Sequence, residues 1–498
     1  MKENKRIIAA LLCVVMVGFT IFAGSRTTME EEVAVVDILD NDSLIVWYTD
    51  DAISDYISSM AVEYHEKYGL RVLPKLQSGD EYIESIYKAS MEENGAPDLY
   101  ILPGDALEKA YMSGCASVID TPDIVSDTNY PASAIKAVTY HHQQVAYPYY
   151  FDTTALIYNK NYLYEMASNL VQAENAKDPG AKKEESETEE ATTEEVIYDS
   201  EIEEIQARAE ASIPTTFDDL LTFANEYDAP PEVETVYKWD VRDIFYNYFF
   251  VGDYISIGGE DGDEAALIDI YNPDAIKAFT FFQDMNQFFA FESADVTYKQ
   301  VVDEFIQGKL VFATVTSDAI ATLKEAKEDG SFKFDYGVTM IPDLTEDMDT
   351  RSMSVTNTLV INGYSDKRKQ ANEFARYLCI DNADSLYDKT GKLPSRTAVF
   401  DKDSKEFAFV QEYSYSVPLP KMMATSNCWL LMENAFADVW SGKDVSTSLK
   451  ELSEQIKYQV TGEEVSEEYI EYEVETETVE YLDEEALKQA AQNEADEE

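Results

Sequence analysis

The sequence predicts an α/β fold divided into two lobes, and three observations support this prediction. The chain has 498 residues, of which 45% are hydrophobic, and that is more than one ordinary core accommodates. From residue 43 onward, short apolar runs alternate with helical patterns, which is the rhythm of parallel strands joined by helices. Aromatic residues make up 12% of the chain, so most of it should fold.

The first elements can be assigned in order from the pattern. Residues 44–48 (LIVWY) are strand-like and end in a Thr-Asp-Asp turn. A helical pattern then runs to Tyr68, and Gly69 stands where a helix C-cap is expected. The next expected elements are a strand at 70–73, a helix at 82–92 and a strand at 98–102. This order predicts a parallel sheet covered by helices.

Residues 1–25 have the pattern of an export signal. Lys2, Lys5 and Arg6 precede an apolar run over 7–24, with small residues at its end. The run is also long enough to serve as a membrane anchor, so a cleaved signal peptide and a retained anchor both remain open. Cys13 follows a large Leu and makes a poor lipidation motif. The bulk of the chain is expected on the extracellular face of the cell membrane.

Three acidic segments interrupt or extend the folded pattern. Residues 26–42 are expected to form a linker, 172–211 a disordered insertion that is helical at most in its second half, and 462–498 a polar tail. Such Glu-rich stretches bury too little apolar surface to offset the entropy of ordering them. We expect the insertion and the tail to be solvated, and a role as a tether that binds cations or contacts the cell wall is the alternative.

Charge and motif content exclude several classes of function. The 98 acidic and 38 basic residues give a net charge of −60, which repels nucleic acid. Cys115, Cys379 and Cys428 have no metal-ligand or disulfide spacing and are expected in the core. The pair His141-His142 is expected to be exposed. Because the chain carries no GxSxG, HExxH or P-loop motif, we expect no catalytic site, metal or cofactor.

Seven segments, in order, resemble one protein family. They cover parts of 43–165 and 213–460: LIVWYTDD with KYGLRV, APDLY, VAYPYYFD with LIYNK, IPTTFDDL, FIQGK, FDYGVTMIP and NCW. Together they are similar to the maltose-binding-protein-like, family 1 extracellular solute-binding proteins of ABC importers.

The resemblance implies a two-lobed periplasmic-binding-protein type II (venus-flytrap) fold. Lobe 1 would comprise 43–152 and 350–395, and lobe 2 would comprise 153–349 and 396–461. A small solute, a mono- or oligosaccharide, would be captured between the lobes and delivered to the membrane permease subunits of the importer. The protein would act as a monomer.

The resemblance also implies which residues contact the solute. Carboxylates pair with sugar hydroxyls and aromatic rings cover the apolar face of a sugar. The candidate ligand-binding residues are Asp51, Asp105, Asp152, Trp429, Tyr254, Trp239, Asp240 and Arg242. Each also has an ordinary structural interpretation: an Asp after a strand is often a turn or cap residue, and a Trp is often part of the core.

The sequence departs from the family pattern at three positions. Ser317-Asp318 replaces a stacking aromatic, acidic Glu433 replaces a basic residue after Trp429, and Ala106 replaces a basic residue after Asp105. These departures disfavour maltodextrin and suit a smaller sugar, an amino sugar or a cationic solute such as a polyamine. A surface-anchored sensor or scaffold of the same fold is a further alternative, and a secreted glycosidase is the least favoured one.

Overall fold

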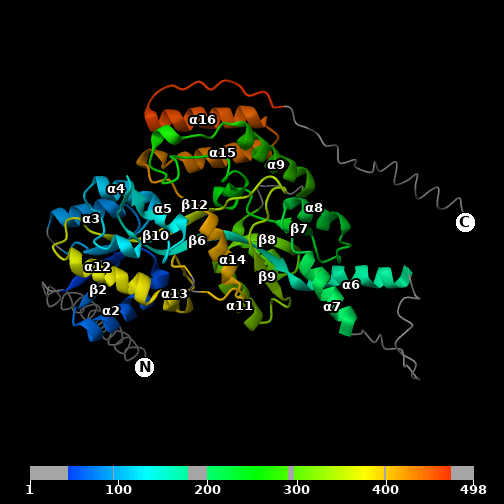
Figure 1. The fold of residues 1–498 in the computed structure, drawn as a ribbon, viewed down its shortest axis with the longest axis horizontal. Coiled ribbons are helices and arrows are strands. Elements are labelled where there is room, and N and C mark those ends of the chain that lie inside the picture. The colour runs from blue at the N-terminus through cyan, green and yellow to red at the C-terminus, as the bar shows by residue number, and fades with distance from the viewer. Residues whose placement is uncertain (1–42, 93–94, 178–198, 290–295, 398–399, 473–498) are drawn as a thin grey trace, which may run out of the picture. The chain divides into compact units, whose positions relative to one another are not determined.

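The computed structural model describes residues 43–92, 95–177, 199–289, 296–397 and 400–472 (Figure 1). The chain divides into two compact units, each built from two stretches of sequence. Unit 1 comprises residues up to 151 together with 356–399, and unit 2 comprises 152–355 together with the residues from 400 onward. These boundaries lie close to those expected for the two lobes. The expected signal or anchor (1–25) and linker (26–42) lie outside the described residues.

Unit 1 contains a mixed sheet in the order β2-β1-β3-β10. Its strands are β1 (Leu44–Tyr48), β2 (Val72–Leu76), β3 (Leu99–Pro103) and the second part of β10 (Met353–Ile361). Strands β2 and β3 both run parallel to β1, whereas β10 is antiparallel to β3. The carboxyl ends of β1, β2 and β3 therefore meet at one edge of this sheet.

Helices cover both faces of this sheet (Figure 1). They are α2 (Ser54–Tyr68), α3 (Tyr82–Met91), α4 (Leu107–Met112), α5 (Ala132–Val138), α12 (Arg368–Arg376) and α13 (Ala383–Thr390). Helix α2 buries Tyr56, Met60 and Tyr64 at helical spacing and ends at Gly69, which has a φ of 79°. This left-handed conformation favours glycine, so the expected C-cap is confirmed.

A short hairpin and a short strand complete unit 1. Strands β4 (Thr139–Tyr140) and β5 (Gln143–Gln144) pair with each other, and His141 and His142 form their turn with positive φ. Both histidines are exposed, as expected. Strand β11 (Leu393–Pro394) pairs with the first part of β6 (Tyr147–Asn159), the long strand along which the chain passes into unit 2.

The sheet of unit 2 is built around the second part of β6. Strand β8 (Leu310–Thr316) pairs antiparallel to it, β7 (Thr235–Lys238) pairs parallel to β8, and β9 (Tyr336–Thr339) pairs antiparallel to β6. Strand β12 (Val417–Pro418) pairs with the start of β10. The carboxyl ends of β7 and β8 thus lie at the same edge, where Thr154 of β6 is opposite Thr316.

Helices and a large aromatic core surround this second sheet. The helices are α6 (Lys160–Lys177), α7 (Asp199–Ala211), α8 (Phe217–Glu226), α9 (Pro273–Phe289), α10 (Tyr298–Ile306), α11 (Asp318–Glu328), α14 (Glu406–Tyr415), α15 (Cys428–Trp440) and α16 (Val445–Thr461). Helix α8 begins with a capping box between Thr216 and Asp219, which satisfies backbone donors at its first turn.

Two of the acidic segments are more ordered than the sequence suggested. Helix α6 continues to Lys177, inside the expected insertion, and packs against α7 through Val171 and Ile205. Arg208 of α7 forms a bidentate pair with Glu174 of α6, at 2.9 and 2.7 Å. The expectation that disorder begins at residue 172 is therefore wrong, because these helices share a small apolar contact. Residues 178–198 lie outside the described part of the chain.

The first residues of the expected tail also pack against the protein. After α16 the chain turns back along this helix (Figure 1). The Ile470 N–H donates to the Tyr271 hydroxyl at 2.7 Å, and the Ile470 carbonyl accepts from Ser446 at 2.8 Å. Ile470 and Tyr472 contact the core of unit 2. Residues 462–472 are therefore a packed strap rather than a solvated tail, and 473–498 lie outside the described residues.

The remaining general expectations concern cysteines and membrane spans. Cys115, Cys379 and Cys428 are free and buried, as expected for small core residues. Burial raises the pKa of the Cys379 thiol to about 12, so it is unreactive at neutral pH. Among the residues that the structure describes, none belongs to a helix with the length and apolar character needed to span a bilayer.

Candidate functional site

The carboxyl edge of the unit 1 sheet carries three aspartates. Asp50 and Asp51 follow β1, and Asp105 follows β3 in a short 3₁₀ helix. Because β1 and β3 are parallel neighbours, the loops after them lie at the same edge. Ligands of open α/β sheets bind outside this edge.

Asp50 is more constrained than Asp51. The Asp50 side chain accepts from the Ala52 N–H at 3.0 Å and from the Tyr150 hydroxyl at 3.2 Å, and it pairs with Lys392 at 3.1 Å. Asp51 is exposed and accepts a local hydrogen bond from the Ser54 hydroxyl at 3.2 Å. Asp50 thus organises the loop and keeps the predicted ligand residue Asp51 at the surface.

Asp105 presents an acceptor without a partner. Its Oδ1 is buried and has no hydrogen bond to any described residue. Burial raises the pKa of this carboxyl, against the hydrogen bonds from the backbone N–H groups of Asp105 and Ala106. Since a buried acceptor that lacks a donor is costly, a ligand hydroxyl or ammonium donating to Oδ1 would be favourable.

The corresponding edge of unit 2 carries Asp152 and Asp240. Asp152 is half-buried and lies two residues before Thr154 in β6, beyond the point where β8 ends. Asp240 follows β7, is 9% exposed, and accepts from the backbone N–H groups of Arg242 at 3.2 Å and Tyr298 at 2.8 Å. Asp240 therefore fixes the start of α10, while Arg242 is exposed at the same edge.

A polar and aromatic cluster at this edge was missed by sequence reasoning. The Tyr298 hydroxyl donates to Asp318 at 2.8 Å, and the Thr316 hydroxyl contacts both Tyr298 and Asp318. The Tyr246 ring stacks on Tyr298 with centroids 5.0 Å apart. Two tyrosine rings thus lie beside Asp318, at the position where the sequence lacks the family's stacking aromatic. Tyr246, Tyr298 and Asp318 are far apart in the sequence, so no local sequence pattern indicated that they lie together.

Helix α15 brings Trp429 and Glu433 to the unit 2 edge. Trp429 is half-buried and its ring lies 6.4 Å from that of Tyr248. Burial raises the pKa of Glu433, and the negative charges of Asp243 and Asp240 raise it further, so Glu433 lies near these carboxylates. Residues four apart share a helix face, and Trp429 therefore lies on the same side of α15 as Glu433.

Two predicted residues lie elsewhere in unit 2. Trp239 is fully buried, donates from Nε1 to Asn247 Oδ1 at 2.8 Å, and stacks on Tyr237 at 4.9 Å. It has no exposed face, so its prediction as a ligand contact is wrong: the indole is a core residue. The Tyr254 hydroxyl donates to the Asp349 carbonyl at 2.9 Å, which ties Tyr254 to the segment before β10 instead of to the edge residues.

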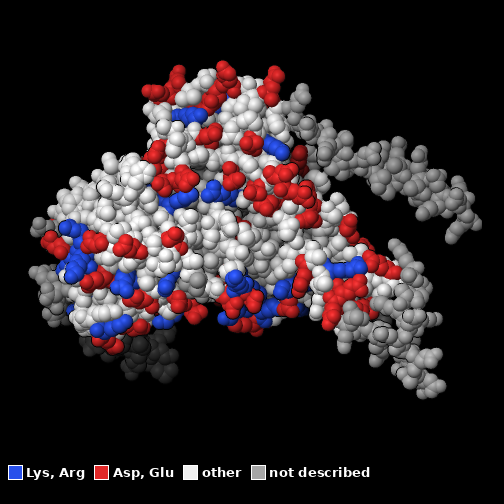
Figure 2. Space-filling model, in the orientation of Figure 1, with Lys and Arg blue, Asp and Glu red and all other residues white. Residues whose placement is uncertain are grey.

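Metal binding is not supported by the arrangement of the described side chains. Within the ranges that the structure describes, no three or more His, Cys, Asp or Glu residues are grouped so that they could hold a metal ion. Figure 2 shows acidic side chains gathered over α16 and over the α6–α7 pair, where they face solvent. The edge residues described above are suited to hydrogen bonding and ring contact.

The chain was compared with known families and structures. The family described as bacterial extracellular solute-binding protein matches residues 59–411. No curated protein matches the chain significantly.

Solved structures of similar fold include three binding proteins. A cyclo/maltodextrin-binding protein complexed with maltotetraose is 20% identical with a TM-score of 0.65, covering 85% of this chain and 98% of its own. An extracellular solute-binding protein from Staphylococcus aureus in complex with maltose is 18% identical with a TM-score of 0.67, covering 84% and 98%. A maltose-binding protein from Listeria monocytogenes is 19% identical with a TM-score of 0.63, covering 86% and 100%. The α/β periplasmic-binding-protein fold expected from the sequence is thereby confirmed.

Proposed function

This chain belongs to the bacterial extracellular solute-binding protein family, and on that premise we propose that its solute is a sugar, either a monosaccharide or a short oligosaccharide. The chain is the solute-binding component of an ABC importer, and the family is extracellular and non-catalytic. The proposal includes delivery of the sugar to the permease subunits of that importer. Members of similar fold whose structures contain maltose or maltotetraose support a sugar.

The observation that carries the proposal is the pairing of acceptors with aromatic rings at the carboxyl edges. In unit 1, Asp105 offers a buried oxygen without a donor, and Asp51 is exposed in the loop after β1, the strand next to β3. In unit 2, Asp318 accepts from the hydroxyl of Tyr298, whose ring stacks on Tyr246, and Asp152 and Trp429 are both half-buried. Sugar hydroxyls donate to carboxylates, and the C–H face of a sugar packs on aromatic rings. We propose that these carboxylates and rings contact the sugar.

A cationic solute is the second candidate, and one observation favours it. At the unit 2 edge the carboxylates raise one another's pKa. Burial raises the pKa of Glu433, and the charges of Asp243 and Asp240 add to this. Burial also raises the pKa of Asp240, and the charge of Asp243 adds to this while Arg242 opposes it. Excess negative charge in a partly desolvated site favours a ligand with positive charge. An amino sugar satisfies both candidates.

A thermal-shift screen tests the proposal. The protein is heated with glucose, maltose, glucosamine and spermidine in parallel, because a ligand that binds only the folded state raises the unfolding temperature. We expect a sugar to stabilise the protein and Trp429→Ala to abolish that shift. Tyr458→Ala removes a ring from α16 that is 57% exposed and serves as the control. Stabilisation by spermidine alone, if Trp429→Ala abolishes it, would favour the cationic solute. An unchanged sugar shift in the Trp429 variant would remove this residue from the site.

A further inference from the structure

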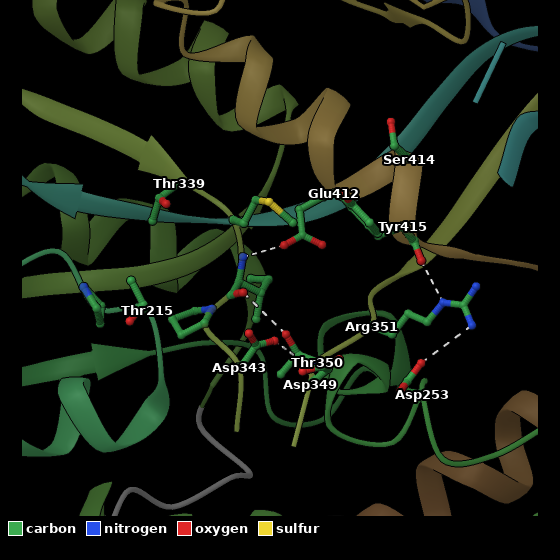
Figure 3. A pocket seen from close by; sticks show the side chains of 14 residues that line it. Thr215, Asp253, Thr339, Asp343, Asp349, Thr350, Arg351, Glu412, Ser414 and Tyr415 are labelled. Atoms are coloured by element: carbon green, nitrogen blue, oxygen red, sulfur yellow. Dashed lines mark hydrogen bonds and ion pairs between the residues drawn. The ribbon is translucent and has the colours of Figure 1, made fainter. Parts of the chain in front are cut away.

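Unit 2 contains a cavity that none of the edge residues lines. It has a volume of about 530 Å³ and lies between the end of α14, the segment that follows β9, and residues 349–351, which lead into β10 (Figure 3). Cavities of roughly 300–1,000 Å³ are typical of small-molecule sites. The cavity is therefore large enough to hold a small ligand, distinct from the solute bound at the edges.

The walls of the cavity combine apolar surface with an exposed aromatic ring. Met340, Ile341 and Pro342, which follow β9, line it together with Pro214. Tyr415, the last residue of α14, also lines it and is 66% exposed. The Tyr415 ring is therefore accessible at the rim of the cavity, where it can pack against an apolar or cationic group of a ligand.

Glu412 lies on the inner side of the cavity. It projects from α14 and is 4% exposed, and its carboxylate accepts a hydrogen bond from the Ile341 N–H (Figure 3). Burial, with a smaller contribution from the nearby charge of Asp343, raises the pKa of Glu412 to about 7. A carboxylate in this environment gains if a positive charge enters the cavity.

Three more carboxylates line the same cavity, those of Asp253, Asp343 and Asp349. Burial raises the pKa of Asp343, and the charges of Asp349 and Asp253 add to this. Arg351 is the one basic residue among the lining residues. Its Nε donates to the Tyr415 carbonyl at 2.7 Å, and its guanidinium lies 3.8 Å from Asp253. Arg351 is thus committed to the rim, on the side away from Asp343 in Figure 3.

We propose that this cavity binds a small organic cation, whose ammonium lies between Asp343, Asp349 and Glu412 and whose carbon chain contacts Met340, Pro342 and the Tyr415 ring. A metal ion fits less well, because these carboxylates are not grouped as metal ligands within the described residues. An organic ammonium needs no close coordination shell and gains from both charge and apolar contact. This site is separate from the solute site of the proposed function.

Calorimetric titration of the full chain with 1,4-diaminobutane tests the inference. We expect saturable binding at one site, and Asp343→Asn should weaken it about tenfold or more, because hydrogen bonds to charged groups contribute roughly 1.5–3 kcal/mol. The amide keeps an acceptor for the Thr350 N–H, which donates to Asp343 at 2.9 Å, so the fold should be retained. The exposed Asp349→Asn is a second variant with the same expected direction.

Matched controls separate this site from the solute edges. Asp347→Asn removes an exposed carboxylate of the same segment that does not line the cavity and should leave diaminobutane binding within about twofold. Trp429→Ala should abolish the sugar response and leave diaminobutane binding intact. The inference is overturned if diaminobutane does not bind, if Asp347→Asn weakens it as much as Asp343→Asn, or if succinate binds instead through Arg351. It is also overturned if Trp429→Ala abolishes diaminobutane binding, which would place the amine at the solute edge.

Discussion

The two units present the same kind of edge with different electrostatics. In unit 1, Asp50 pairs with the Lys392 ammonium at 3.1 Å and accepts a hydrogen bond from the Tyr150 hydroxyl, and the Lys392 ammonium lies 5.6 Å from the Tyr150 ring. In unit 2, Asp240 and Glu433 lie among other carboxylates, and burial raises the pKa of both. In unit 1 a lysine ammonium therefore balances the charge of Asp50 and fixes its loop, whereas unit 2 concentrates negative charge that a ligand can relieve.

The largest expected effect concerns the pH response of unit 2. The pKa of Glu412 is raised from 4.5 to about 7, chiefly by burial. The folded state therefore holds this proton more tightly than the unfolded state. The stabilisation is full below about pH 4.5, is lost as the pH rises through about 7, and amounts to about 3 kcal/mol. We expect Glu412→Gln to remove this part of the pH dependence.

Denaturant unfolding at a series of pH values measures this effect. The wild type and Glu412→Gln should differ in the slope of stability against pH between about 4.5 and about 7. Glu346→Gln changes an exposed carboxylate of unit 2 and should keep the wild-type profile. Parallel profiles for wild type and Glu412→Gln would show that Glu412 titrates normally and that the contrast between the units is overstated.

The next effect concerns Asp105 at the unit 1 edge. Asp105→Asn removes the charge of the unpartnered oxygen and should weaken solute binding by about 2 kcal/mol, or roughly thirtyfold. The same change should raise the stability of the free protein, because burial disfavours the ionised carboxyl. A substitution that weakens solute binding but raises stability indicates a residue whose role is binding and not folding.

Titration calorimetry and thermal unfolding of the same samples separate these two effects. Asp123→Asn, an exposed carboxylate of unit 1, is the control and should change neither quantity appreciably. If Asp105→Asn lowers stability and leaves affinity unaltered, then Asp105 is a structural residue of the loop.

The smallest effect tests the neutralised loop of unit 1. Lys392→Met leaves Asp50 without its ammonium partner and should lower the unfolding free energy by about 1 kcal/mol, since the pair is partly shielded from solvent. Lys369→Met breaks a more exposed pair with Glu373 at 4.0 Å and should have a smaller effect. Equal losses in chemical denaturation would argue that Lys392 adds no special stability to the edge.

Local sequence patterns predicted much of the fold. Strand β1 coincides with its expected range, and helix α2 ends at Gly69 as the capping rule requires. The position of Asp105 after β3 followed from the strand pattern alone. Strand β2, however, begins two residues later than expected, at Val72, because pairing with β1 sets its register.

Features that depend on distant contacts could not be predicted in the same way. Trp239 is buried because Tyr237 and Trp440 pack on it, and Trp440 lies two hundred residues later in the chain. The strap at 462–472 is held by Ile470 and Tyr472, which contact the core, and by Glu467, whose carboxylate pairs with Lys457 at 2.7 Å. The contact of Tyr298 with Asp318 likewise depends on how α10 and β8 meet. Composition and periodicity carry no information on such contacts.

The central claim is that the solute is a sugar and that Asp105 and Trp429 both take part in binding it, and one titration tests it most directly. The sugar that most stabilises the protein is titrated into the wild type, into Asp105→Asn from unit 1 and into Trp429→Ala from unit 2. The account predicts that each single substitution weakens binding by about tenfold or more. Saturable binding that either variant retains at the wild-type affinity would contradict it.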